Sequence, residues 1–375
     1  MKYFALAGIF GLIAAPAFAQ SGSTGQPDWV SQAKIVAEME GISVGEAIRR
    51  GNLERRLAAA IERLENDDAY AGSFIERDGK SFKVVNLFTR TGMSGKSGSA
   101  DLESASEYRS ARFSLGEIKT YQRKIVPTLA SVDANSYSSI KIHDNALVIR
   151  TTNEAGVRAA LGNIPDFVRF ETGGWHVGQD AAMSGGGAIT ATSGSCTAGF
   201  NVKGAVTGVS TASHCVPFGL LRYQGVSIGT HRGPAFVKGT TDKAGRDFTW
   251  YRNDANTYNN AVLYGTGFYS VTSVAPANVA PNTSACLIKQ DGSQGCAWVS
   301  EVATPPGGTV PAVIMDRRIS VPGDSGGAWL YGSIAYGTNQ GTICDDAAMT
   351  INCKSLYSPA ANMPSVLGVS VITTP

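Results

Sequence analysis

The stretch RRISVPGDSGGAWLYGS, residues 317–333, decides how the rest of the chain is interpreted. Ser325 lies among three glycines and Asp324, and an apolar run follows it. Glycine, aspartate and serine are also the ordinary residues of a tight turn before a strand, so the segment alone does not make Ser325 a nucleophile. The pattern G-x-S-x-G also fits the nucleophile turn of the α/β-hydrolases. Partner residues elsewhere in the chain have to decide between these interpretations.

The order of residues along the chain tests the α/β-hydrolase interpretation. A serine hydroxyl is a poor nucleophile at neutral pH and needs a base beside it. The four histidines, His143, His176, His214 and His231, all precede Ser325. An α/β-hydrolase places its acid and then its histidine after the serine, so that interpretation is excluded.

The order histidine, aspartate, serine remains open, and the sequence supplies it. His214 ends the run GVSTASH and adjoins Cys215, and Asp247 begins the run DFTWYR after a glycine-led turn. Each residue taken alone could be an ordinary polar residue at a strand end or in a turn. Their joint occurrence in one order predicts a catalytic triad of His214, Asp247 and Ser325.

The overall composition excludes other classes of protein. The 375 residues include 32 basic and 30 acidic ones, a formal net charge of +2, which gives no case for a nucleic-acid partner. With four histidines and no Cys/His cluster at ligand spacing, the sequence predicts no metal and no other cofactor. A hydrophobic fraction of 43% allows a packed core, and the length allows two or three domains.

The first residues, MKYFALAGIFGLIAAPAFAQ, have the pattern of a secretory signal peptide. Lys2 precedes an uncharged apolar run that ends in small residues at Ala17 and Ala19. The run is short for a membrane span, which needs about 20 apolar residues. We therefore expect residues 1–19 to be a signal peptide, and the rest to be secreted, outside the cell or into the periplasm, without membrane attachment.

Export changes the meaning of the cysteines. An even number of cysteines in an oxidising compartment predicts disulfides, here three of them. Many pairings are open, and the order of the cysteines as three close pairs favours nearest neighbours; the residues are Cys196, Cys215, Cys286, Cys296, Cys344 and Cys353.

Charge divides the chain into two halves. Residues 1–183 hold 21 basic and 21 acidic residues, whereas residues 184–375 hold 11 and 9, together with every cysteine. The small-residue stretch GQDAAMSGGGAITATSGS, residues 178–195, reads as a linker between the halves.

The first half predicts an α+β region. Ser43 and Glu46 form a capping box at a helix start, an Asp-Gly turn joins two strand-like runs, and Thr152 or Asn153 caps a later helix. The predicted elements are helices within 29–41 and 43–66, two strands within 73–89, and a strand followed by a helix within 145–164.

The second half predicts an all-β domain. Short apolar runs separated by Gly, Pro, Asn and Asp favour a sandwich or barrels. These runs are TAGFNV, GVSTAS, FTWYR, SACLIK, CAWVSEV, AVIMD and GAWLYGSIAYG.

Five motifs carry a family resemblance. SCTAGFNV, TASHC, RDFTW, ACLIKQDGSQGC and PGDSGGAW resemble the bacterial chymotrypsin-like serine proteases of the α-lytic protease and streptogrisin group. The resemblance covers about residues 184–375. The first half, around YAGSFIERDGKSFKVVNLFT, is more loosely similar to the pro-regions of that group.

The resemblance implies a fold and a set of roles. It implies two antiparallel β-barrels with an active site between them, His214 as the base and Asp247 as the residue that orients it. It implies an oxyanion hole formed by the backbone N–H groups of Gly323 and Ser325. It also implies disulfides Cys196–Cys215 and Cys286–Cys296. Protein or peptide substrates, a monomeric state and a pro-region that acts as intramolecular chaperone and inhibitor follow from the same resemblance.

The chain departs from its relatives near the specificity pocket. They often carry a cysteine shortly before the nucleophile, where this chain has Ile319, Ser320 and Val321, and Cys344 would instead pair with Cys353. Ile319 occupies the place where a carboxylate would select Arg or Lys. We therefore expect cleavage after apolar residues.

The segment GTNQG, residues 337–341, is expected to supply the strand that pairs with substrate. Asn339 stands where a serine usually supports the aspartate. The expected substrate-binding residues are Ile319, Pro322, Asn339, Gln340 and Gly341.

Together these patterns predict a signal peptide at 1–19, an α+β pro-region at 20–180 and a serine endopeptidase domain at 181–375, made as a zymogen that acts through an acyl-enzyme. The alternative is a catalytically inactive, protease-like secreted binding module. A further alternative makes the first half an independent functional domain.

Overall fold

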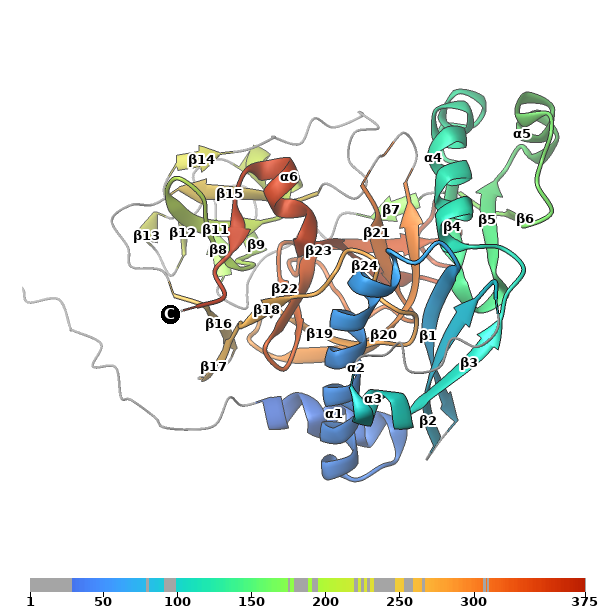
Figure 1. The fold of residues 1–375 in the computed structure, drawn as a ribbon. Helices are drawn as coiled ribbons and strands as arrows, with labels where there is room; N and C mark the ends of the chain where they lie inside the picture. Colours follow the sequence, from blue (N-terminus) through green and yellow to red (C-terminus); the bar gives the residue numbers. More distant parts are fainter. Residues whose placement is uncertain are drawn as a thin grey trace, which may run out of the picture.

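The computed structural model shows three regions side by side (Figure 1), with the N-terminal region in blue to green, a central barrel in orange and red, and a group of short strands in yellow-green. The predicted signal peptide and the predicted boundary at residue 180 lie outside the described residues. The structure describes residues 29–78, 81–90, 99–174, 176–178, 188–190, 195–218, 222–223, 226–227, 230–232, 247–252, 259–264, 267–305, 308 and 310–374.

The N-terminal region is α+β, as predicted. Ser43 Oγ accepts a hydrogen bond from the Glu46 N–H at 3.1 Å, and Asn153 Oδ1 accepts one from the Gly156 N–H at 3.0 Å, so both predicted caps are confirmed. The elements are α1 (Trp29–Glu40), α2 (Val44–Leu64), β1 (Tyr70–Asp78), β2 (Ser81–Phe88), α3 (Ala100–Ser104), β3 (Ser106–Ser110), α4 (Leu115–Val132), β4 (Tyr137–Lys141), η1 (Ile142–Asp144), β5 (Ala146–Thr151), α5 (Glu154–Leu161) and β6 (Val168–Thr172).

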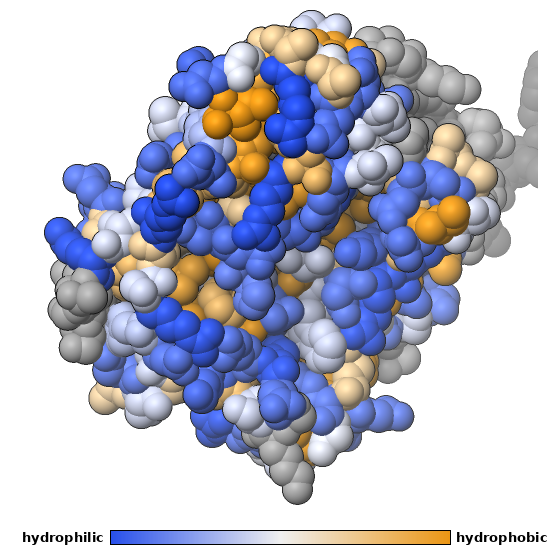
Figure 2. All heavy atoms as spheres, turned by 90° about the vertical axis from the view of Figure 1, so that its right-hand side faces the viewer, coloured by the Kyte–Doolittle hydropathy of each residue, from blue (hydrophilic) through white to orange (hydrophobic). Residues whose placement is uncertain are grey.

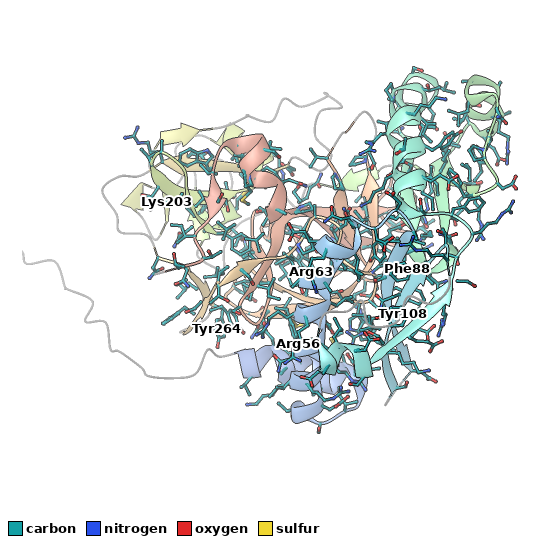
Figure 3. The ribbon with its side chains drawn as sticks, in the orientation of Figure 1. Arg56, Arg63, Phe88, Tyr108, Lys203 and Tyr264 are labelled. Carbon is teal, nitrogen blue, oxygen red and sulfur yellow. A yellow bond between two sulfur atoms is a disulfide. The ribbon has the colours of Figure 1, made fainter. Side chains whose placement is uncertain are left out.

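Two groups of three strands organise this region. β1, β2 and β3 form one of them, and Figure 3 shows Phe88 of β2 near Tyr108 of β3, whose rings stack with centroids 6.1 Å apart. β4, β5 and β6 continue a larger sheet. The long helix α4 was not predicted; it begins after the cap Ser114 and continues through Pro127.

The C-terminal half contains a closed barrel of six antiparallel strands in the order β19-β22-β23-β24-β21-β20, which β20 closes by pairing with β19. Its large buried side chains include Trp329 and Tyr357. The strands are β19 (Ser284–Ile288), β20 (Gln294–Thr304), β21 (Ala312–Met315), β22 (Ala328–Tyr331), β23 (Ile334–Cys344) and β24 (Lys354–Pro359).

The short strands beside the barrel form a five-stranded sheet, β14-β15-β11-β10-β25, and a four-stranded sheet, β13-β12-β8-β9. The strands of these sheets are β8 (Ala188–Thr190), β9 (Ser195–Thr197), β10 (Asn201–Lys203), β11 (Thr207–Thr211), β12 (Arg222–Tyr223), β13 (Val226–Ser227), β14 (Thr230–Arg232), β15 (Thr249–Arg252) and β25 (Ser370–Val371). The remaining elements are β7 (His176–Gly178), η2 (Ser213–Phe218), the hairpin β16 (Ala261–Tyr264) and β17 (Gly267–Ser270), β18 (Ser273–Val274), η3 (Ala360–Asn362) and α6 (Met363–Leu367).

Every short apolar run of the second half that predicted a strand contains one, so the all-β prediction is confirmed. The linker prediction is wrong for residues 188–190, because β8 pairs with both β9 and β12. The reason is that Ile189 is fully buried, and one apolar residue among small ones is enough to seat a short strand.

The N-terminal region packs directly on the closed barrel. β4 pairs antiparallel with β20, so the barrel sheet runs on into β5 and β6. Ala33 and Val36 of α1 belong to the same buried cluster as Trp329 and Tyr331 of the barrel. Figure 2 shows the opposite, outward face of this region, which is mostly hydrophilic with small separate apolar areas. Within the described chain, no helix is long and apolar enough to span a membrane.

Candidate active site

A histidine and an aspartate meet in a buried pair among the short strands. β11 ends at Thr211 and leads into the turn η2, which carries His214, while Asp247 lies just before β15. Because β11 and β15 pair with Thr211 opposite Thr249, the two side chains reach each other. His214 Nδ1 lies 2.5 Å from Asp247 Oδ2, and each residue is 3% exposed.

Asp247 receives further hydrogen bonds from the same turn. Its Oδ1 accepts the backbone N–H of His214 at 3.0 Å and the hydroxyl of Ser213 at 2.7 Å. Burial raises the pKa of Asp247, but the positive charge that His214 can carry and these hydrogen bonds outweigh burial and hold that pKa below its ordinary value. Asp247 is therefore a carboxylate at neutral pH.

Ser325 lies in a buried loop that packs against the segment leading to His214. The Thr197 N–H donates to the Ser325 carbonyl at 2.7 Å. At Gly326, which has φ +88°, a Cβ would lie 2.2 Å from Thr211 Oγ1 and 2.9 Å from the Ala212 nitrogen. Only glycine allows this approach, because any side chain would push the serine loop away from the strand end that precedes His214.

The turn before Ser325 is held by Gly323 and Asp324. Gly323 has φ +100°, a conformation that favours glycine. The buried carboxylate of Asp324 accepts the N–H groups of Val321 and Gln290, each at 2.9 Å. Burial raises the pKa of Asp324. These contacts fix the path of the backbone that carries the N–H groups of residues 323 and 325.

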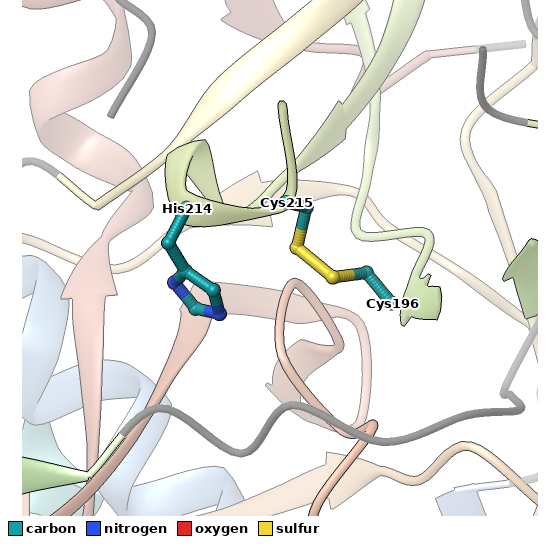
Figure 4. Close-up of side chains that lie close together, drawn as sticks. All are labelled: Cys196, His214 and Cys215. Carbon is teal, nitrogen blue, oxygen red and sulfur yellow. A yellow bond between two sulfur atoms is a disulfide. The ribbon is translucent and has the colours of Figure 1, made fainter. Parts of the chain in front are cut away.

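A disulfide anchors the turn of the histidine. Cys215 follows His214 and is bonded to Cys196 of β9 (Figure 4). Within the described residues, the ligand atoms of Cys196, His214 and Cys215 come within 4.8 Å of one another. Because both sulfurs are bonded to each other, they offer no thiolate to a metal, and this cluster fixes backbone instead.

The strand predicted to pair with substrate already has a partner. β7 lies antiparallel on β23, with Thr342 opposite Gly178, Ile343 opposite Val177 and Cys344 opposite His176. The predicted substrate-binding residue Gly341 directly precedes this pairing. A segment at the end of the N-terminal half thus lies on β23 directly after the residues expected to pair with substrate.

Two characterised proteins resemble the chain in sequence. Streptogrisin-C of Streptomyces griseus is 28% identical over 193 residues, which are 48% of this chain and 39% of that protein. Serine protease 1 of Streptomyces fradiae is 25% identical over 336 residues, which are 84% of this chain and 86% of that protein. The chain thus matches well under half the length of streptogrisin-C. No protein-family model matches the chain.

Two solved structures also match part of the chain. Thermobifida fusca protease A is 27% identical, with 52% of this chain and 100% of that chain covered at a TM-score of 0.39. Cellulomonas bogoriensis chymotrypsin is 24% identical, with 52% and 100% covered at a TM-score of 0.38.

The chain is a relative of the bacterial chymotrypsin-like serine proteases.

In this protease relative, one detail of the sequence analysis is wrong. Asn339 does not support Asp247: its Nδ2 donates to the Asp324 carbonyl at 3.1 Å, and its Oδ1 accepts the Trp329 Nε1–H at 3.0 Å. Both polar groups of the Asn339 side chain are therefore engaged by the serine loop and by Trp329. The hydroxyl beside Asp247 comes from Ser213 instead.

The other expected substrate-binding residues differ in exposure. Gln340 is the extra residue of a bulge between Asn339 and Gly341 and is 3% exposed. Pro322 is exposed, and Ile319 is partly buried against the barrel core.

Buried hydroxyls lie beside Ile319. Ser320 Oγ is within 2.9 Å of Ser355 Oγ, 3.4 Å of Thr342 Oγ1 and 3.2 Å of the Gly341 carbonyl. The Ile319 N–H also donates to Ser355 Oγ at 2.9 Å. These polar groups satisfy one another.

The structure joins the cysteines as nearest neighbours. Besides Cys196–Cys215, it forms Cys286–Cys296 between β19 and β20, and Cys344–Cys353 between the end of β23 and the segment before β24. Sequence reasoning missed two features of this site, the hydroxyl of Ser213 and the strand β7. The only indication of Ser213 in the sequence was its position next to His214, and no sequence pattern indicated the strand β7.

Proposed function

We propose that the chain is a secreted serine endopeptidase that acts through Ser325, His214 and Asp247. The observation that carries this proposal is the buried pair of His214 and Asp247 next to a glycine-shaped serine loop. The similarity to bacterial serine proteases supports the same reaction class.

In the proposed reaction, Ser325 Oγ attacks the carbonyl carbon of the peptide bond while His214 Nε2 takes its proton. Asp247 accepts the Nδ1–H and stabilises the imidazolium that forms. The backbone N–H groups of Gly323 and Ser325 bind the oxyanion of the tetrahedral intermediate. His214 then protonates the leaving amine, and water hydrolyses the acyl-enzyme by the same steps.

We also propose that residues 1–19 are a signal peptide and that residues 20–180 are a pro-region, removed to release residues 181–375. The pairing of β7 with β23 supports inhibition by this region, because β7 occupies residues 342–344, directly beyond the segment 337–341 that a substrate is proposed to use. A cut after β7 would free that strand. Because the cleaved N-terminal region keeps β7 and could bind again, it would have to be degraded for full activity.

The pairing of β4 with β20 supports a role in folding. An all-β domain has mostly non-local contacts, and the chain loses entropy on closing the loops between them before those contacts can stabilise the fold. β4 offers β20 a preformed partner at Val302, Ala303 and Thr304. A segment that templates the hairpin of β20 and β21 in this way would lower the folding barrier.

For specificity we propose apolar residues before the cleaved bond. Ile319 lies beside hydroxyls that already bond to one another, and Asp324 is engaged by backbone N–H groups. Asp316 pairs with Arg317, so both carboxylates of the described residues 316–325 are engaged and neither is offered to select a basic side chain.

Labelling with a fluorophosphonate tests the proposed function. The processed wild-type protein should be labelled at Ser325 and should cleave peptides, and Ser325→Ala should lose both properties. A folded wild-type protein that neither takes the label nor cleaves peptides would favour the alternative of an inactive secreted binding module. The mass of the secreted product shows whether the N-terminal half is removed.

A further inference from the structure

The carboxylate of Asp247 is held from one short turn. Among the described residues, Oδ2 accepts from the His214 ring, and Oδ1 accepts from the His214 backbone and from the Ser213 hydroxyl. Ser213 is 6% exposed and Asp247 is 3% exposed, so bulk water does not replace these donors. We infer that Ser213 is a positioning residue of the triad, whose hydroxyl holds Oδ1 of Asp247 so that Oδ2 stays aimed at His214. This inference rests on the proposed function.

The geometry gives the hydroxyl a specific effect. A carboxylate can rotate about its Cβ–Cγ bond. A single donor on Oδ1 would restrict this rotation only weakly, because the second lone pair of Oδ1 would accept no hydrogen bond. The hydroxyl at 2.7 Å and the N–H at 3.0 Å bind the same oxygen from adjacent residues. Together they fix the plane of the carboxylate relative to the imidazole ring.

The turn that carries both donors is itself anchored. Ser213 begins η2, and Cys215 at its third position is bonded to Cys196 of the neighbouring sheet. A hydroxyl on this turn therefore moves with His214. The arrangement keeps the base and the orienting group of the acid in one rigid unit.

Other side chains near the serine loop do not take this role. Asn339 bonds to Asp324 and Trp329. The hydroxyls of Ser320 and Ser355 bond to each other. Ser213 is thus the side-chain hydroxyl that the described structure places on the triad carboxylate.

The effect on chemistry follows from charge. A hydroxyl donor withdraws negative charge from the carboxylate, and its loss makes Asp247 a stronger acceptor for the Nδ1 proton. The imidazolium is then favoured in the free enzyme, while the ring is less well oriented for proton transfer. The acidic limb of the pH dependence of kcat/KM should move to higher pH, and kcat should fall.

The test compares Ser213→Ala with Ser213→Thr, which keeps a hydroxyl, in the processed form of the full-length protein. The matched control is Ser210→Ala on β11, a fully buried serine whose hydroxyl accepts the Phe200 N–H at 2.8 Å and lies off the triad. The probe is a chromogenic peptide amide that the wild type cleaves, and the downfield proton NMR signal of His214 Nδ1–H is recorded in parallel.

For Ser213→Ala we expect kcat to fall about tenfold with KM nearly unchanged, as for the loss of one hydrogen bond to a charged group. The acidic limb of the pH dependence of kcat/KM should shift to higher pH by about half a pH unit, and the Nδ1–H signal should move. Ser213→Thr should return the limb and the signal to their wild-type positions. Ser210→Ala should change the melting temperature alone.

If Ser213→Ala lowers only the melting temperature and leaves the pH limb and the Nδ1–H signal in place, the role is structural and the inference is overturned. The NMR signal needs no turnover and can also be read in Ser325→Ala. Loss of the proposed function would appear as an inactive wild type, and the position of the Nδ1–H signal would still decide the role of Ser213.

Discussion

Replacing Arg150 by alanine should weaken the hold of the N-terminal half on the protease half. Arg150 of β5 lies with Nη1 3.0 Å from Oε1 of Glu301 on β20, and the two side chains are 13% and 3% exposed. Burial raises the pKa of Glu301, but Arg150 and Lys141 outweigh burial and hold that pKa below its ordinary value. Among the described residues, the cations on this barrel carboxylate come from the N-terminal half.

The magnitude follows from breaking a buried pair by removing one partner, which costs about 3–5 kcal/mol. Lys141 Nζ stays 3.1 Å from Glu301 Oε2, so some compensation remains in the variant. We therefore expect the lower end of that range, about 3 kcal/mol, which is about a hundredfold in affinity.

The assay is inhibition of one wild-type processed protease by residues 20–180, which include β7, added as a separate chain, so that the enzyme itself is unchanged. The matched control is Arg169→Ala on β6, an arginine that is 58% exposed and pairs with Asp144. The inhibition constant should rise about a hundredfold for Arg150→Ala and less than about twofold for the control. A rise of less than about threefold for Arg150→Ala, or an equal rise for both, would refute the reasoning.

Four further predictions concern catalysis, specificity, folding and pH. His214→Ala should lower peptidase activity by about four to six orders of magnitude, and more than about a hundredth of wild-type activity would argue against its role as base. A peptide library should show a graded preference for small or medium apolar residues before the cut, because one methylene is worth about 1–3 kcal/mol; a profile led by basic or acidic residues would contradict this. Residues 181–375 refolded alone should give little activity, and added residues 20–175 should restore it; efficient unaided refolding would point to another role. The pKa of Glu301 is lowered, so its ion pairs contribute fully to binding of the N-terminal half above the ordinary carboxyl pKa, and this contribution is lost as the pH falls through the lowered pKa. Acidification should therefore release the N-terminal half from the Ser325→Ala protease. Glu301→Gln should remove this part of the pH dependence.

Much of the candidate site could be predicted from the sequence because its residues carry local signals. A histidine next to a cysteine and a serine among glycines are recognisable without knowing what surrounds them. Gly326 shows why: the approach of Thr211 and Ala212 excludes any side chain there, so the contact leaves its mark in the sequence. The pairs of cysteines were likewise close enough in sequence to suggest their partners.

The rest depends on contacts that leave no such mark. Which hydroxyl supports Asp247 depends on the direction of a side chain at a strand end, and Asn339 could be excluded only from its bonds to Asp324 and Trp329. The pairing of β4 with β20 joins segments more than 150 residues apart, and backbone hydrogen bonds favour no particular side chain there. The helix α4 was missed because Pro127 lies inside it, and a proline normally argues against a helix interior.

The two long strands of the barrel explain why the N-terminal half contacts it at two places. β20 pairs with β19 as far as Trp298, has a bulge after Val299, and pairs with β4 from Val302. β23 pairs with β22 as far as Thr338, has a bulge after Asn339, and pairs with β7 from Thr342.

Each strand therefore extends past its barrel neighbour and has an open edge beyond a bulge. The backbone N–H and C=O groups of an open edge can pair with another strand. A peptide substrate can satisfy the edge of β23, which fits its proposed place beside Ser325. We assign no such catalytic use to the edge of β20. The buried Glu301 lies on β20 directly before the residues that pair with β4. The N-terminal half covers both edges at once, one with β7 and one with β4. This arrangement would link the proposed inhibition and the proposed folding assistance to the same physical cause, a closed barrel with two strands that are longer than their partners.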